Sequence, residues 1–475
     1  MPRFHEEEVL RSGTAGVFTP HSLILNIESM ADLFPEGISI EDDPTFPQVI
    51  ALHVHEYIHY LHNLTTRSGL SCLVDIFLLM HPLLQQKINV EDREADKAQQ
   101  AHVRNVFNSI RKSQGYVIGI PDRYKWRPIS RWEFSQVTAS FDSMPEAIMD
   151  PEQQIEFDVK AVFPDGEELD FRLMPGLKFI TEGIAYEIER DIKMRWGISA
   201  TEVDLSTPAY PYLMYGPLLE YLAGTKLSSK ERIAIGLLSL LATSPSVVLT
   251  SLSKLTSRKP GTLGATLFTA IEQSTLEGFE SYSAHFIDDL IPLLYQVLSG
   301  SEILTKGMKV YEALILKGLS SRASRPALEL AFLVDKMNIK KFDNIATHLL
   351  ERVIFQKKPD SALEIRWIGS KEGTGQMSGD MHEAFAVLQS CIHYVQQHLK
   401  NNGLETRQSL NPTPCPFRGA CTVEQAAGNP QVCRSNPWDA YNLGENSVPC
   451  VYQAGVDAFK SLVKPSATVD ETLPF

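Results

Sequence analysis

Two histidines and one glutamate occur at a spacing that could hold a metal ion and use it. The sequence His55-Glu56-Tyr57-Ile58-His59 is an H-E-x-x-H pattern within residues 47–66, where apolar residues recur at helical spacing. Residues four apart on a helix project from one face, so both imidazoles could bind one zinc ion. The intervening Glu56 could then take a proton from water activated by the metal. The alternative is a pair of packed or solvent-facing histidines.

A zinc ion that acts on a substrate needs a third protein ligand and one coordination position left open. The candidate is Glu182, on a helix predicted over residues 177–195, where Gly183 is small enough to allow close packing against another helix. Glu189 follows seven residues later and therefore shares the face of Glu182. We expect Glu189 to orient a ligand histidine through the free N–H of its ring.

Three other residues compete for roles near such a metal. Glu91 and Glu94 are rival third ligands, but they belong to a charged stretch that is more typical of a solvated helix face. His62 lies seven residues after His55 and points toward the same face. We expect His62 to pack against or support the ligands rather than to bind the metal.

A hydrolytic site also needs a donor that stabilises the oxyanion formed when water adds to a carbonyl. Tyr210, Tyr212 and Tyr215 follow the helix that carries Glu182 and could supply it. We favour Tyr215, because the adjacent Gly216 permits a close approach. Any of the three tyrosines could instead be a packing residue.

These two segments together resemble the gluzincin metallopeptidases, especially their aminopeptidase-like branch. The resemblance rests on H-E-x-x-H and on Glu-Gly-x-Ala-x-x-x-Glu over residues 182–189, and it extends over residues 22–190. It implies that His55, His59 and Glu182 are zinc ligands and that Glu56 is the general base. Because 122 residues separate His59 from Glu182, the β-rich region between them is expected to be an insertion. No Gly-Ala-Met-Glu-Asn-like exopeptidase motif is present, so endopeptidase and exopeptidase activity both stay open.

Four cysteines cluster in a region rich in Pro, Gly and Asn near the C-terminus. Cys415, Cys421, Cys433 and Cys450 form C-x5-C-x11-C-x16-C, in a segment with little apolar material for a core of its own. Four thiolates suit a closed structural zinc site or an iron–sulfur cluster. Isolated thiols and disulfides are the alternatives. The remaining cysteines, Cys72 and Cys391, lie in apolar helical stretches and are expected to be buried thiols.

The composition disfavours two other classes of partner. The chain has 475 residues, 44 Lys+Arg against 58 Asp+Glu and a net charge of −14, so nucleic acid is a poor partner. The longest uncharged run, 233–253, contains Pro245 and many hydroxyl residues. It is expected to form two buried helices rather than a membrane span. The charged N-terminus lacks a secretory pattern, which predicts a cytoplasmic protein.

We therefore predict an α+β, mostly α, fold with a zincin-like catalytic region that contains a small sheet. The expected units are a metallopeptidase core over 1–200 with a β-rich insertion at 115–175, a helical domain over 201–405 and a Cys-rich tail over 406–475. The expected β-hairpin centres on Pro164-Asp165-Gly166. Residues 216–400 are expected to be mostly helical, with breaks at 254–264 and 357–360.

The predicted activity is zinc-dependent hydrolysis of peptide bonds in an intracellular protein or peptide, with a regulatory protein as a further partner. One alternative is a helical interaction protein with a structural metal centre. The other is a redox or nucleic-acid-linked regulator that uses the cysteine tail.

Overall fold

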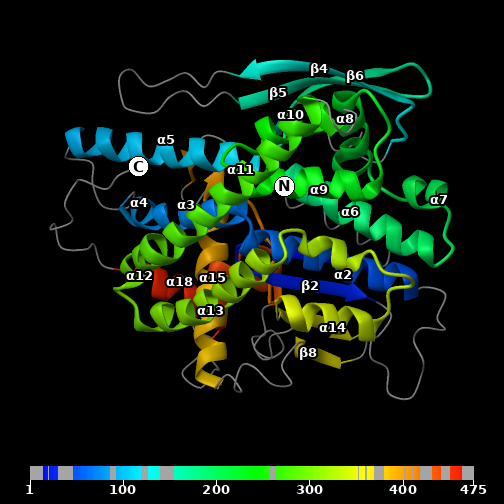
Figure 1. Cartoon of the computed structure of the whole chain (residues 1–475). Helices are drawn as coiled ribbons and strands as arrows, with labels where there is room; N and C mark the ends of the chain where they lie inside the picture. The colour runs from blue at the N-terminus through cyan, green and yellow to red at the C-terminus, as the bar shows by residue number, and fades with distance from the viewer. Residues whose placement is uncertain are drawn as a thin grey trace.

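The computed structural model describes residues 14–19, 21–29, 46–85, 93–118, 127–139, 154–256, 263–350, 352–358, 361–368, 379–400, 403–405, 407, 410–417, 430–439 and 450–462. Over these residues the protein is mostly helical and contains two four-stranded sheets (Figure 1). The expectation of a mostly α, α+β fold is confirmed at this level.

The first helices are α2 (Phe46–Thr65), α3 (Arg67–Leu78), α4 (Met80–Gln85) and α5 (Arg93–Gln114). The break after α2 falls at Thr66, whose hydroxyl accepts a hydrogen bond from the backbone N–H of Gly69 and so caps α3. A second break falls at Leu79. Pro82 lies in the first turn of α4, where its missing N–H costs no helical hydrogen bond.

An antiparallel sheet follows, formed by β3 (Tyr116–Ile118), β4 (Arg131–Ala139), β5 (Gln154–Val162) and β6 (Glu168–Met174). Its order is β3-β6-β5-β4. The predicted hairpin is confirmed as β5 and β6, and Gly166 takes the positive φ of 85° that the turn between them requires. From β6 the chain passes directly into α6 (Leu177–Arg195), as predicted. The sheet therefore leads into the helix that carries Glu182.

A run of helices fills the middle of the chain. It comprises α7 (Ala200–Leu205), η3 (Ala209–Leu213), α8 (Met214–Ala223), α9 (Ser229–Leu241), α10 (Pro245–Thr256), α11 (Leu263–His285), η4 (Phe286–Leu290), α12 (Ile291–Leu298), α13 (Glu302–Ser324), η5 (Leu328–Phe332) and α14 (Ile339–Leu349). The uncharged run forms α9 and α10 with a break before Pro245, as predicted. In the described part of the chain one helical stretch, Arg67–Leu84, is long and apolar enough to cross a membrane, but 72% of it is buried within the protein, as in a core helix.

The second sheet joins strands that are far apart in the sequence. Its order is β1 (Thr14–Thr19), β2 (Ile24–Ser29), β7 (Arg352–Lys358) and β8 (Ser361–Ile368), with β2 and β7 parallel. The expected break at 357–360 falls at the junction of β7 and β8, but the expectation of helix on both sides of it is wrong, because short apolar runs there pair as a hairpin. A unit boundary near residue 200 stays a prediction, although this sheet joins strands from both sides of it.

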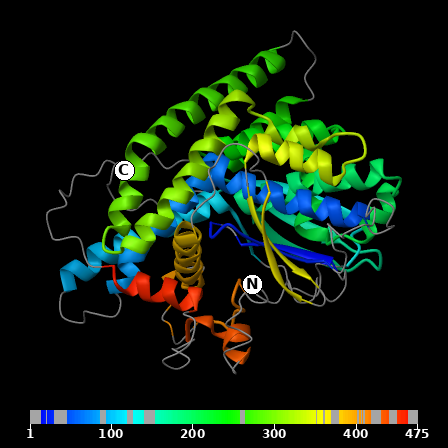
Figure 2. The ribbon, with the colours of Figure 1, turned by 90° about the horizontal axis from the view of Figure 1, so that it is seen from below.

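The last elements pack against the helical body. They are α15 (Gly379–Gln397), β9 (Leu399–Lys400), β10 (Gly403–Leu404), α17 (Pro430–Ser435), η7 (Pro437–Asp439) and α18 (Val451–Lys460). Figure 2 shows α18 lying against α15. Gly455 makes this contact close, because a Cβ added there would lie 2.4 Å from Cβ of Ser390.

Helix α2 lies in the interior of the protein. Nearly all of its residues are buried, and it packs mainly against α6, with α3, α13 and β1 around it. In Figure 1, α2 and α6 lie between β4–β6 on one side and β2, α14 and β8 on the other. The H-E-x-x-H pattern therefore belongs to a core helix with a fixed neighbour.

Candidate metal centre

The pairing of α2 with α6 brings the three predicted ligands together. Oε2 of Glu182 lies 3.4 Å from Nε2 of His55 and 3.3 Å from Nε2 of His59. One ligand atom from each residue falls within 4.8 Å of the others, and in the described part of the chain no other group of His, Cys, Asp and Glu does so. Two imidazole nitrogens and one carboxylate oxygen form a donor set that zinc favours.

Glu189 lies where the sequence predicts it. Its Oε2 is 2.7 Å from Nδ1 of His55, and Lys193 forms an ion pair with its other oxygen. Nδ1 of His55 is thus the proton-bearing nitrogen, and Nε2 is left to face Glu182. Burial alone would raise the pKa of Glu189, but Lys193 and His55 hold it below its usual value.

Behind His59 lies a second group of polar residues, all buried. Nδ1 of His59 is 3.4 Å from Oγ1 of Thr181, and the same hydroxyl contacts Nδ1 of His62. Nε2 of His62 lies 3.1 Å from Oε1 of Glu329 in η5. His62 therefore supports the ligands from behind, in agreement with the prediction that it does not bind the metal.

The arrangement fits a cation. Oε2 of Glu182 is buried and receives no well-aligned hydrogen bond from the described residues, while two imidazole nitrogens face it. Burial alone would lower the pKa of His55, but contacts with Glu182 and Glu189 raise it well above its usual value. Burial would raise the pKa of Glu182, but the two histidines hold it well below its usual range. A proton on His55 and a divalent cation therefore compete for the same position.

Glu56 has the properties of a general base beside this donor set. Its side chain is in the interior, and only 6% of the residue is exposed. Burial raises the pKa of Glu56, partly opposed by the charges of His59 and His55. A carboxylate with a raised pKa is a stronger base than a solvated one.

The tyrosines differ from the expectation. Tyr215 is fully buried, its hydroxyl donates a hydrogen bond to the carbonyl oxygen of Arg232 at 2.8 Å, and its ring packs on Gly183. The structure therefore gives Tyr215 a packing role in place of the catalytic role expected from the sequence. Instead, the ring of Tyr212 lies 5.8 Å from the ring of His55. Gly183 and Gly236, and not the flanking Gly216, leave room for the ring and hydroxyl of Tyr215 in the core, so the glycine next to Tyr215 did not indicate access to a cleft.

The rival ligands and the cysteines are described only in part. Glu91 lies outside the described residues, and Glu94 belongs to α5 but its side chain is outside them. Of the cysteine cluster, Cys421 lies outside the described residues, Cys415 is buried, and Cys433 and Cys450 are half-buried against the core.

Cys415 and Cys433 are adjacent, because the backbone N–H of Cys415 donates to the carbonyl oxygen of Cys433 at 2.8 Å. As predicted, Cys72 and Cys391 are buried thiols.

Two residues that sequence reasoning missed are Thr181 and Glu329. Thr181 directly precedes Glu182, and that adjacency was the only signal available for it. No sequence signal pointed to Glu329, because this residue reaches His62 only when η5 folds onto α2.

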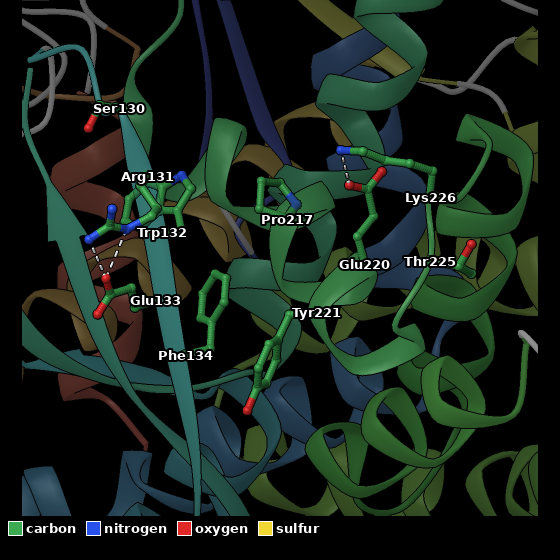
Figure 3. Close-up of a pocket in the computed structure, with 10 residues that line it drawn as sticks. All are labelled: Ser130, Arg131, Trp132, Glu133, Phe134, Pro217, Glu220, Tyr221, Thr225 and Lys226. Carbon is green, nitrogen blue, oxygen red and sulfur yellow. Dashed lines mark hydrogen bonds and ion pairs between the residues drawn. The ribbon is translucent and has the colours of Figure 1, made fainter.

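A surface hollow lies away from these residues. It has a volume of about 750 Å3 and lies between β4 and α8, with Trp132, Phe134 and Tyr221 on its apolar side (Figure 3). Salt bridges Arg131–Glu133 and Lys226–Glu220 lie along its rim. None of the metal-centre residues lines it.

Comparison with known proteins finds no matching family model, no similar curated protein and no similar solved structure. The functional argument therefore depends on the geometry of the site.

Proposed function

We propose that this protein is a zinc-dependent metallopeptidase that hydrolyses peptide bonds of a protein or peptide. The observation that carries the proposal is the convergence of His55, His59 and Glu182 from two helices, although 122 residues of sequence separate His59 from Glu182. Three protein ligands leave one position for water and substrate, whereas a structural zinc site is closed by four. The same donor set is the one implied by the resemblance to gluzincins.

The side chain of Glu182 is 24% exposed and that of His59 is 10% exposed, so the ligands can be reached from solvent. When bound, a zinc ion would supply Lewis acidity that polarises a carbonyl group and acidifies water.

The protein side chains have separate parts in this chemistry. Glu56 accepts the proton of the attacking water and later delivers it to the leaving amine. Glu189 keeps the Nε2 lone pair of His55 directed toward Glu182, where a zinc ion would bind. Tyr212, whose ring lies 5.8 Å from that of His55, is the tyrosine that we propose as hydrogen-bond donor to the developing oxyanion.

The test separates metal binding from hydrolysis. The purified protein should contain zinc and cleave members of a quenched-fluorescence peptide library or an unfolded protein substrate. Glu56→Gln should keep the zinc and lower kcat about 10²–10⁴-fold, because it removes the base and not a ligand. Glu187→Gln is the matched control, since Glu187 is buried on α6 but pairs with Arg232 at 3.0 Å. Cleavage that survives Glu56→Gln at the wild-type rate would refute the mechanism.

We also propose that the C-terminal cysteines hold a second metal centre, either zinc or an iron–sulfur cluster. The backbones of Cys415 and Cys433 are adjacent. Burial raises the pKa of Tyr452 well above its usual value, and the charges of Cys415 and Cys450 contribute to the same increase, so these two cysteines lie near Tyr452. Sulfur ligands suit a thiophilic metal, although among the described residues the sulfur atoms of Cys415, Cys433 and Cys450 do not all lie within 4.8 Å of one another.

Metal analysis should find a second equivalent that is lost in Cys433→Ser, and visible absorption would distinguish the cluster from zinc. An unchanged metal content in this variant would exclude the second centre.

A further inference from the structure

The polar residues behind His59 form a connected path that begins at a buried ion pair. Arg322 of α13 and Glu329 of η5 are both fully buried, and two guanidinium nitrogens donate to the two carboxylate oxygens at 2.7 and 2.9 Å. Nη2 of Arg322 also donates a hydrogen bond to Oγ1 of Thr65 in α2, at 2.7 Å. Burial alone would raise the pKa of Glu329, but Arg322 and His62 hold it below its usual value. Glu329 is therefore an ionised group that only accepts hydrogen bonds.

Because the Glu329 carboxylate can only accept, it determines which nitrogen of His62 carries a hydrogen. Nε2 of His62 lies 3.1 Å from Oε1 of Glu329, although the two are not aligned as a hydrogen bond. A ring nitrogen that faces an ionised carboxylate at this distance carries the hydrogen, because a bare lone pair there would be repelled by the carboxylate oxygen. Burial lowers the pKa of His62, which favours the neutral ring. In a neutral ring with hydrogen on Nε2, Nδ1 is an acceptor. The hydroxyl of Thr181 contacts that Nδ1 and therefore donates to it.

The hydroxyl of Thr181 has then used its hydrogen and can only accept from other groups. Nδ1 of His59 lies 3.4 Å from this oxygen, within hydrogen-bonding reach, and must supply the hydrogen. Nε2 of His59 is consequently the unprotonated nitrogen, and it is the atom that faces Glu182 at 3.3 Å. Every donor and acceptor along the path is consistent with one assignment.

We propose that Glu329 is a positioning residue of the metal centre. It acts through His62 and Thr181 and fixes the tautomer and ring orientation of His59, as Glu189 does directly for His55. The inference rests on the metal centre of the proposed function, but it does not require hydrolysis. It also gives the helical region after residue 201 a part in building the metal centre.

The test measures zinc affinity by competition with a chromophoric chelator, using the full-length protein. Glu329→Gln should weaken zinc binding about 10–100-fold, the usual effect of losing a group that supports a ligand histidine. A carboxylate accepts hydrogen bonds on two oxygens, whereas the Gln amide has one accepting oxygen and one donating nitrogen. It therefore cannot accept from both Arg322 and His62 in the same way, and the hydrogen-bond directions are no longer fixed. Glu187→Gln is the control, because it also breaks a buried Glu–Arg pair but has no path to His59 among the described contacts.

Thr181→Val tests the path with a milder change, since valine has nearly the shape of threonine but no hydroxyl. It should weaken zinc binding to a similar extent, Thr181→Ser should restore it, and the double variant with Glu329→Gln should be no weaker than the more affected single variant. With Co²⁺ in place of zinc, the visible spectrum should change in Glu329→Gln and not in Glu187→Gln.

Zinc affinity in Glu329→Gln or Thr181→Val equal to that of Glu187→Gln would overturn the proposal. A protein that binds zinc with these differences but cleaves nothing would instead refute the peptidase function alone.

Discussion

The contact between Glu189 and His55 allows a quantitative prediction about zinc binding. The carboxylate lies 2.7 Å from Nδ1 of the imidazole, its side chain is only 16% exposed, and Lys193 holds its other oxygen. A hydrogen bond to an ionised acceptor at this distance is short and strong. Replacing Glu189 by Gln keeps the shape but removes the charge that makes His55 a better ligand.

We expect Glu189→Gln to weaken zinc binding about 10–100-fold, which corresponds to about 1.4–2.7 kcal/mol. Isothermal competition with a chelator of known affinity would measure it, with Glu187→Gln as the control on the same helix. The effect should be at least as large as that of Glu329→Gln, because Glu189 touches a ligand directly. Equal zinc affinity in Glu189→Gln and the control would refute the idea that this carboxylate tunes the ligand.

Four further predictions concern other residues. Tyr215→Phe should cost about 1 kcal/mol of stability through the lost hydrogen bond to Arg232 and leave kcat unchanged. Tyr212→Phe should lower kcat about 10²-fold or more with little change in stability. A large loss of kcat in Tyr215→Phe together with an unchanged kcat in Tyr212→Phe would instead identify Tyr215 as the oxyanion donor. Burial raises the pKa of Asp75 from 3.8 to about 7, so its contribution to stability is complete below pH 4 and is lost as the pH rises through 7. In urea unfolding, Asp75→Asn should therefore be more stable than wild type at pH 8, by up to about 4 kcal/mol, and no gain there would contradict this pKa. Gly183→Ala should lower Tm, because the new Cβ would lie 2.1 Å from Cγ of Tyr215, and a cost of about 1–3 kcal/mol is expected. An unchanged Tm would mean that α6 and α8 are less closely packed than the structure indicates.

Local sequence patterns are sufficient to predict the elements that carry the chemistry. Helical periodicity predicted both α2 and α6, with bounds close to those observed. Local spacing was sufficient for His55 and His59, because four residues on a helix set their relative direction regardless of the rest of the chain. The same reasoning predicted that Glu189 shares a face with Glu182. These are properties of single segments, so no knowledge of the fold was needed.

Which side chains of different segments meet is set by the tertiary structure. Helix packing brings Glu182 beside the two histidines, turns Tyr215 into the core and brings Glu329 to His62. Strand pairing joins β2 to β7, more than 300 residues apart, although local periodicity predicted helix around β7. Such contacts depend on packing and strand pairing across the whole chain, and the local pattern of hydrophobic residues does not record the partner.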